Sequence, residues 1–216
     1  MSLRINDTIP NLKVISDMGD FYLHEWIGDH WAILFSHPKD FTPVCTTEFG
    51  AVASLRDEWE ARNTKVIGIS VDNVEDHKNW KEDIQKYAQN PAYFPIISDV
   101  DLAVSKAFGM LPGEAYLPDG RTPNDTATVR SVFIIGPDKA LKLSMTYPMT
   151  VGRNFAEVLR ALDALQLSSQ KAVATPADWQ KGEDVIIPAT LSDEEAEQKF
   201  GPFNKILPYL RKVNVH

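Results

Sequence analysis

The fold is decided by the stretch Trp31-Ala-Ile-Leu-Phe-Ser-His-Pro-Lys-Asp-Phe-Thr-Pro-Val-Cys45, which leads from an apolar run into the start of a helix. Residues 31–35 are continuously apolar and aromatic at both ends, a pattern typical of a strand buried on both faces. Thr42 and Pro43 form a helix-start signal, with threonine as N-cap and proline at the first helical position. Apolar residues then recur at helical spacing, which predicts an amphipathic helix to about Arg62.

Predicted strands and helices alternate along the chain on both sides of this stretch. We expect further strands at 65–71 and 93–98, helices at 75–89, 101–108 and 154–167, and a β-hairpin made of 129–135 and 141–147. Pro95 indicates that the 93–98 strand begins there or lies at an edge. Alternating strands and helices predict an α/β fold with right-handed crossovers and a largely parallel sheet, to which the hairpin adds an antiparallel part.

The character of the chain changes after about residue 170, where prolines interrupt the sequence. Only Ser192-Asp-Glu-Glu195 opens a convincing helix there, with a capping-box pattern. We therefore expect a catalytic domain over residues 1–168 and a small C-terminal appendage over residues 169–216.

Composition excludes several classes of protein. The chain has 216 residues, of which 44% are hydrophobic and 24% charged, so intrinsic disorder is ruled out. The 22 Lys+Arg against 30 Asp+Glu give a net charge of −8, which argues against nucleic-acid or anionic-membrane partners. The apolar runs fall far short of the ~18–20 residues of a membrane span. Residues 1–7 lack the apolar stretch of a secretory signal, so we expect a cytoplasmic protein.

Cys45 is the single cysteine of the chain. It has no partner for an intrachain disulfide, and thiolate-rich zinc or iron–sulfur sites are excluded. Cys45-Thr-Thr-Glu48 is also not a Cys-x-x-Cys motif, so dithiol exchange within the chain is ruled out. The sequence therefore leaves two interpretations: an inert buried thiol, or a nucleophile that is restored from outside.

The position of Cys45 favours the nucleophile. The helix start at Thr42 places it in the first turn, where unpaired backbone N–H groups and the helix dipole favour the thiolate. The capping threonine hydroxyl is expected to lie near Cys45, and the site follows the carboxyl end of a strand, where open α/β sheets bind ligands. A cysteine hydrolase would need a histidine base. His37 is near in sequence, and a structural role and a donor role remain equally open for it.

The stretch around Cys45 resembles the signature of a known protein family. Pro38-Lys-Asp-Phe-Thr42-Pro-Val-Cys45 matches the Pro-x-x-x-Thr-x-x-Cys signature of peroxiredoxins. Further stretches along nearly the whole chain resemble the one-cysteine, peroxiredoxin-6-type subfamily: Phe94-Pro-Ile-Ile97, Gly136-Pro-Asp-Lys139, Gly152-Arg-Asn-Phe155 and Ala174-Thr-Pro-Ala-Asp-Trp179. The resemblance implies a thioredoxin-like fold, with a central mixed sheet flanked by helices and a small C-terminal appendage, and a homodimer.

The resemblance also implies roles for the residues of the signature. Cys45 would attack a peroxide oxygen and become a sulfenic acid. Arg130 would stabilise the thiolate and orient the peroxide, while Thr42 and the Cys45 N–H would hold its oxygens. Pro38 would shield the thiolate from solvent.

Three more residues are assigned supporting roles in the same way. Glu48 and Arg153 resemble the pair that fixes the arginine at the start of the hairpin, although without the family a surface salt bridge is the simpler interpretation of the two. His37 resembles the pocket histidine of the subfamily, a donor near the sulfur.

The chain departs from the subfamily at one motif. Some members carry a Gly-x-Ser-x-Gly element and a Ser/His/Asp set associated with phospholipase activity. The matching stretch here is Gly28-Asp-His30-Trp-Ala32, which has no serine. His24 and Asp138 remain without a nucleophile, so we do not expect lipase chemistry.

The sequence thus predicts a thiol peroxidase that reduces hydrogen peroxide and organic hydroperoxides without a bound cofactor or metal. The alternatives are a redox-linked chaperone or binding protein, and a monothiol transferase, on the same fold. Because no second thiol exists in the chain, we expect an external thiol reductant. The resemblance points to glutathione, supplied directly or by a glutathione transferase.

Overall fold

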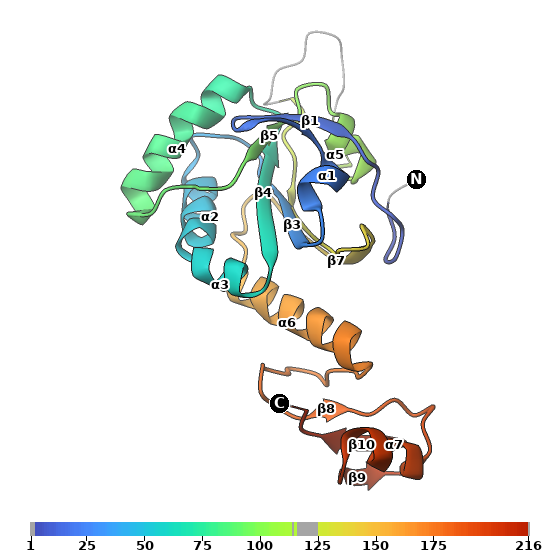
Figure 1. The fold of residues 1–216 in the computed structure, drawn as a ribbon. Helices are drawn as coiled ribbons and strands as arrows, with labels where there is room; N and C mark the ends of the chain where they lie inside the picture. Colours follow the sequence, from blue (N-terminus) through green and yellow to red (C-terminus); the bar gives the residue numbers. More distant parts are fainter. Residues whose placement is uncertain (1–2, 114, 116–124, 216) are drawn as a thin grey trace. The chain divides into compact units, whose positions relative to one another are not determined.

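A seven-stranded sheet in the order β2-β1-β5-β4-β3-β6-β7 organises the first part of the chain (Figure 1). The computed structural model describes residues 3–113, 115 and 125–215. The strands are β1 (Lys13–Ser16), β2 (Gly19–Tyr22), β3 (Trp31–Ser36), β4 (Thr64–Ser70), β5 (Ile96–Ser98), β6 (Arg130–Ile135) and β7 (Leu141–Tyr147). The hairpin predicted from 129–147 is present as β6 and β7.

The sheet is mixed, and its parallel part is smaller than predicted. Only β3 with β4 and β4 with β5 pair in parallel, and every other pairing among the described strands of this sheet is antiparallel. The sequence analysis missed the short β1–β2 hairpin, which pairs antiparallel with β5 through Ser16 and Ile97. A four-residue strand with one exposed face carries little periodic signal, so its pairing is decided by the tertiary structure.

Helices cover both faces of this sheet. Helices α2 (Pro43–Ser54) and α4 (Val74–Ala88) lie on one side in Figure 1, and α1 (Leu23–Ile27) and α5 (Ala103–Ala107) on the other. Every residue of β3 is consequently buried, as its apolar run predicts. Phe35 of β3 meets Phe49 of α2 at a ring separation of 4.8 Å, which anchors α2 against the strand that precedes it.

The helix predicted to run to about Arg62 is broken into two. Helix α2 ends at Ser54; Leu55, its C-cap residue, has a ψ of 20°, and α3 (Arg56–Ala61) follows directly. The Ser54 hydroxyl donates to the carbonyl of Gly50 at 2.9 Å. Back-bonding of this kind often bends helices, and here it lies next to the break.

The C-terminal unit contains more structure than the sequence indicated. Helix α6 (Phe155–Lys171) is followed by β8 (Val185–Ile186), α7 (Asp193–Phe200), β9 (Asn204–Leu207) and β10 (Leu210–Val213), and the three strands form an antiparallel sheet in the order β8-β10-β9. The predicted capping box is present, with Ser192 and Glu195 bonded reciprocally. A small core holds the unit together: Val173, Trp179, Val185, Ile187, Ala196 and Val213.

The chain divides into units at a different residue from the one expected. The units are Met1–Arg153 and Asn154–His216, so α6 belongs with the C-terminal unit. The physical reason is that Ala164 and Leu167 of α6 pack against the small C-terminal core. In the described part of the chain, no helix has both the length and the apolar character needed to cross a membrane.

The packing of α2 on the sheet depends on a glycine. A Cβ at Gly68 of β4 would lie 2.7 Å from two ring carbons of Phe49. We expect Gly68→Ala to lower the free energy of unfolding by about 1–3 kcal/mol, because the buried aromatic ring has to be displaced. Gly113→Ala is the control, since a Cβ at that position would have no atom of the described residues within 4 Å of it. Urea unfolding of both variants measures the difference, and equal midpoints would contradict this account of the packing.

Candidate active site

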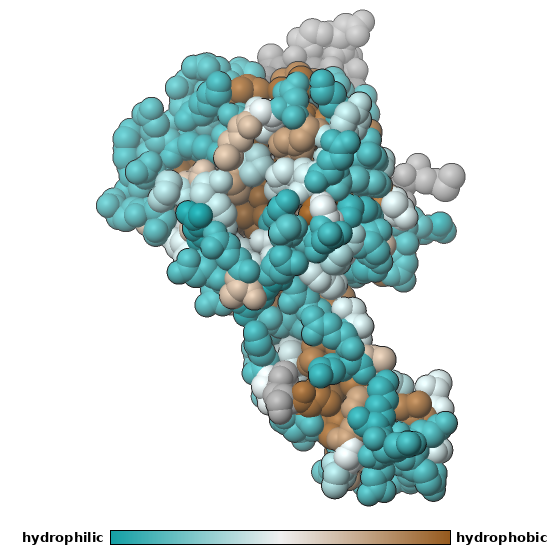
Figure 2. Space-filling model, viewed as in Figure 1, coloured by the Kyte–Doolittle hydropathy of each residue, from teal (hydrophilic) through white to brown (hydrophobic). Residues whose placement is uncertain are grey.

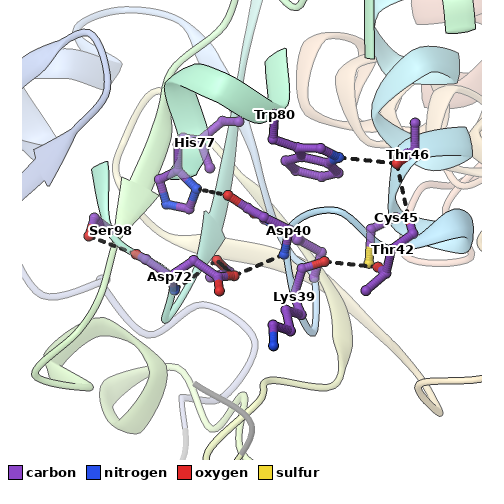
Figure 3. Close-up of polar contacts among 12 residues, drawn as sticks. Lys39, Asp40, Thr42, Cys45, Thr46, Asp72, His77, Trp80 and Ser98 are labelled. Atoms are coloured by element: carbon purple, nitrogen blue, oxygen red, sulfur yellow. Dashed lines mark hydrogen bonds and ion pairs between the residues drawn. The ribbon is translucent and has the colours of Figure 1, made fainter. Parts of the chain in front are cut away.

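Cys45 lies in the first turn of α2, directly after the loop that leaves β3. Thr42 is the N-cap residue with extended backbone angles, and Pro43 begins the helix, as the sequence predicts. The Cys45 side chain is completely buried. Figure 3 shows its sulfur beside Thr42 at the helix start. The site therefore combines a buried thiol with the unpaired N–H groups of a helix N-terminus.

Arg130 reaches this thiol from the first residue of β6. Its Nη1 lies 3.4 Å from Sγ of Cys45 and 2.6 Å from Oε2 of Glu48. Its Nε donates to the carbonyl of Met149 at 2.7 Å. Hydrogen bonds on both sides of the Arg130 guanidinium fix its orientation, and its positively charged Nη1–H group faces the sulfur.

Glu48 lies between two arginines. Its Oε1 accepts from Nε of Arg153 at 2.9 Å, and its Oε2 accepts from Nη2 of Arg153 at 2.7 Å as well as from Arg130. Nη1 of Arg153 donates to the carbonyls of Ser36 and Ser131. Glu48 and both arginine side chains are each no more than 3% exposed, so the group is a buried network rather than a surface salt bridge.

The charge of Glu48 is maintained by this network. Burial on its own raises the pKa of a carboxyl group. Hydrogen bonds and charge interactions with Arg153, and the charge of Arg130, outweigh burial and hold the pKa of Glu48 below its ordinary value of 4.5. Glu48 is therefore ionised at neutral pH and compensates the two guanidinium groups.

Thr42 differs from the expectation in one respect. Its hydroxyl donates to the carbonyl of Lys39 at 2.9 Å and does not cap the helix through a side-chain bond. The first helical bonds are instead made by its carbonyl, which accepts from both the N–H and the hydroxyl of Thr46. Pro38 is half-buried in the loop before Thr42.

His37 is engaged by a carboxylate. Its Nε2 lies 2.6 Å from Oδ1 of Asp40, and its Nδ1 is buried without a hydrogen-bond partner among the described residues. The ring stacks on Trp80 at 4.9 Å and meets the edge of Phe49 at 4.6 Å. The role of a donor near the sulfur, which the resemblance implied for His37, stays a prediction, and the bond that the structure shows is to Asp40.

The sequence analysis missed the buried residues of α4. It predicted a helix at 75–89 without assigning it buried residues, whereas His77, Trp80 and Ile84 are fully buried. Their spacing of three and four residues was the available signal. His77 matters most, because its Nδ1 lies 2.6 Å from Oδ2 of Asp40.

One cluster of described residues has the spacing of a metal site. Ligand atoms of His37, Asp40 and Asp72 all lie within 4.8 Å of one another. Their oxygens already accept hydrogen bonds, however, from the two histidines, from the N–H of Asp40 and from Ser70. Hydrogen bonding accounts for the arrangement of this cluster.

The residues that match the phospholipase set have structural partners. His24 Nε2 is bonded to the carbonyl of Ile9 at 2.8 Å, and Asp138 pairs with Lys142 at 2.6 Å. His30 stands in place of the serine nucleophile. His24 and Asp138 are thus both engaged in structural contacts.

Comparison with known proteins identifies relatives over nearly the whole chain. The AhpC/TSA family matches residues 5–144, and the C-terminal domain of 1-Cys peroxiredoxin matches residues 164–201. Peroxiredoxin-6 of Mus musculus is 49% identical over 217 residues, covering 97% of this chain and 95% of its own. The mitochondrial peroxiredoxin PRX1 of Saccharomyces cerevisiae is 48% identical over 212 residues, covering 97% and 80%.

Solved structures give the same result. A yeast mitochondrial 1-Cys peroxiredoxin superposes with a TM-score of 0.89 at 46% identity, covering 98% of this chain and 99% of the other. A mutant of peroxiredoxin 6 from Arenicola marina gives 0.91 at 42% identity, covering 99% and 98%. The predicted thioredoxin-like α/β fold is confirmed.

The buried carboxylate gives a pH-dependent prediction. At pH 7, Glu48→Gln should lower the free energy of unfolding by about 3–5 kcal/mol, since two buried guanidinium groups lose their counter-charge. The folded-state pKa is depressed, so the stabilisation by Glu48 is present above the ordinary carboxyl pKa and is lost as pH falls through the folded value. The stability difference between wild type and variant should therefore be constant near neutrality and shrink below about pH 4.3.

Urea unfolding at several pH values measures this difference. Glu60→Gln is the matched control, because Glu60 pairs with Arg56 on the exposed surface. A gap between wild type and Glu48→Gln that stays unchanged down to pH 3 would refute the assignment of charge to Glu48.

Proposed function

The chain belongs to the AhpC/TSA family, and within it to the one-cysteine peroxiredoxins, which are thiol peroxidases; from this premise we propose that Cys45 is the nucleophile that reduces hydrogen peroxide and organic hydroperoxides. The observation that carries the proposal is the Arg130 guanidinium held 3.4 Å from the buried Cys45 sulfur. An inert core cysteine has no need of a fixed cation.

The reaction follows from this pair. The Cys45 thiolate attacks one peroxide oxygen, so an S–O bond forms as the O–O bond breaks. Two electrons pass from sulfur to the peroxide, and the departing hydroxide or alkoxide takes a proton to leave as water or alcohol. Negative charge grows on the leaving oxygen during this step. A fixed guanidinium beside the reacting atoms stabilises that charge.

Thr42 supplies the complementary contact. Its hydroxyl proton is already donated to the carbonyl of Lys39, so towards a peroxide its oxygen acts as an acceptor. We propose that the O–H of the peroxide donates to it, which leaves the oxygen atoms facing the sulfur and Arg130. The Cys45 N–H, in the first helical turn, is a second donor for those oxygens. Pro38, half-buried in the same loop, screens the thiolate from water.

Two substitutions test these roles. Cys45→Ser should abolish peroxide consumption, and consumption that survives it would refute the assignment of Cys45 as the nucleophile. Arg130→Met should lower the second-order rate constant with hydrogen peroxide by about 100- to 1,000-fold, because one preorganised donor to developing charge is lost. Arg56→Met is the control, since that arginine pairs with Glu60 on the exposed surface. An unchanged rate in Arg130→Met would show the assignment to be wrong.

We propose that an external thiol restores Cys45. The sulfenic acid reacts with one thiol to form a mixed disulfide and water. A second thiol then attacks the external sulfur of that disulfide, which releases the Cys45 thiolate and an external disulfide. The structure of the yeast relative concerns thiol resolution through glutathione and thioredoxin systems, which supports glutathione as a reductant here. A glutathione transferase is the proposed carrier. The cytoplasmic location expected from the sequence stays a prediction, and the yeast relative is mitochondrial.

The lone, buried thiol gives a test of this scheme. Limiting peroxide without reductant should add oxygen to Cys45 and give no disulfide-linked dimer, because the sulfur is completely buried and no other cysteine exists in the chain. Intact-mass analysis and non-reducing electrophoresis measure both products. Quantitative formation of a disulfide dimer would overturn the recycling scheme and leave the peroxidase reaction standing.

We also propose a homodimer. Strand β7 is an edge of the seven-stranded sheet, and an unpaired edge can continue the sheet into a second chain. The C-terminal unit adds apolar surface, which Figure 2 shows as brown patches on the visible face of that unit. Ile206, Leu207 and Tyr209 of this unit are exposed. Sedimentation velocity at micromolar concentration should give the mass of two chains, and a single monomeric species would contradict this.

A further inference from the structure

The cluster around Asp40 is buried, charged and unused by the reaction as described so far. Both carboxylate oxygens of Asp40 are bonded to histidines at 2.6 Å, Oδ1 to His37 and Oδ2 to His77. Both histidine rings are completely buried, and Asp40 is 2% exposed. Figure 3 shows Asp40 lying between His77 and the start of α2, where Thr42 and Cys45 are found.

The hydrogen-bond partners of the two histidines determine the protonation state of each ring. The Nδ1 of His77 faces the Asp40 carboxylate, and its Nε2 faces the carbonyl of Ile97 at 3.2 Å. Both partners accept only, so both nitrogens of His77 carry protons and the ring is an imidazolium paired with an ionised Asp40. Burial raises the pKa of a carboxyl group, but the bonds from the two histidines outweigh it and hold the pKa of Asp40 below its ordinary value.

His37 is then the neutral partner. Its Nε2–H donates to Asp40, and its Nδ1 has no partner among the described residues that could receive a second proton. Burial lowers the pKa of His37, and this effect outweighs the opposing bond to Asp40. Asp40 therefore holds His37 as a single tautomer with an open lone pair on Nδ1.

Two routes connect this cluster to Thr42. Along the backbone, the N–H of Asp40 is tied to Oδ2 of Asp72 at 2.9 Å, and the adjacent Lys39 carbonyl receives the Thr42 hydroxyl. Across the helices, the His37 ring stacks on Trp80. Nε1 of Trp80 then donates to the Thr46 hydroxyl at 3.1 Å, and that hydroxyl donates to the Thr42 carbonyl at 2.9 Å.

Phe41, which lies between Asp40 and Thr42, has a strained backbone conformation. Phe41 has a φ of 57°, a left-handed conformation that is rare for a bulky residue, and its own side chain is 53% exposed. Such a conformation persists only where its surroundings enforce it. Here the enforcing contacts are those of Asp40 on one side and Thr42 on the other.

We propose that Asp40 and His77 are positioning residues of the peroxidase reaction: they clamp the loop that presents the Thr42 oxygen to the peroxide and keep His37 in one neutral form. This inference rests on the proposed function of Cys45 and Thr42. The further claim is that the buried Asp40–His77 ion pair, which includes a residue of α4, keeps the Thr42 hydroxyl oxygen free to accept a hydrogen bond. This ion pair contacts neither the sulfur nor the substrate.

Rate measurements test the clamp. Asp40→Asn and His77→Ala should each lower the second-order rate of Cys45 oxidation by hydrogen peroxide at least tenfold. His77→Asn should recover most of that loss, because its amide N–H can replace Nδ1–H as the donor to Asp40.

Asp17→Asn is the matched control for these rates. Asp17 is also a buried carboxylate paired with a residue of α4, Lys81, but none of its contacts leads to Thr42. Its rate should stay within twofold of wild type. A rate within twofold of wild type in Asp40→Asn, or an equal loss in Asp17→Asn, would overturn the proposal.

Nitrogen-15 NMR of the histidine rings provides a readout that needs no turnover. In the wild-type protein, His37 should show a bare Nδ1 and a protonated Nε2, and His77 should show protons on both nitrogens. A protonated Nδ1 on His37 or a neutral His77 would refute the inference, even if every variant were too unstable to assay. Lack of peroxide reactivity in the wild type would instead refute the proposed function, while the spectra would still decide the state of the two histidines.

Discussion

The bond between Glu48 and its two arginines is the interaction on which the site depends. Arg130 and Arg153 come from distant parts of the chain, and both would be buried cations without a counter-charge if this carboxylate were absent. Glu48 follows Cys45 by three residues, on the same face of the helix, so α2 carries both the nucleophile and the group that orients its partner. Because Arg153 also bonds the carbonyls of Ser36 and Ser131, the network ties α2 to the ends of β3 and β6.

This arrangement allows the Cys45 thiol to be reactive although it is buried. The sulfur has no exposed surface, yet a charged donor, a helix N-terminus and a polar loop surround it. A small peroxide is suited to such a recess, since few atoms have to enter. The same burial separates the thiol from a second copy of itself, which fits the use of an external reductant. Protection of the sulfur thus follows from its burial, whereas the need for an outside thiol follows from Cys45 being the single cysteine of the chain.

The loop from His37 to Thr42 is held from several directions. Asp40 and its histidines fix one end, the Thr46–Trp80 contact fixes the other, and Phe41 between them has a left-handed backbone. A short loop with this many fixed contacts presents the Thr42 hydroxyl in one direction. Preorganisation of this kind is what gives a polar contact its catalytic value, because the group does not have to reorient during the reaction.

Local signals in the sequence determined the strand 31–35, the helix start at Thr42–Pro43, the hairpin and the capping box at Ser192, because periodicity, capping and turn residues act over a few positions. These signals and the position of the lone Cys45 predicted an α/β fold and favoured a reactive thiol, and the resemblance to peroxiredoxins added the thioredoxin-like fold and the peroxidase reaction. Only the tertiary structure decided the antiparallel β1–β5 pairing, the assignment of α6 to the C-terminal unit, and the contacts of Asp40 with His77. These depend on residues far apart in the chain meeting in a packed interior, and a single sequence carries no local signal for such meetings.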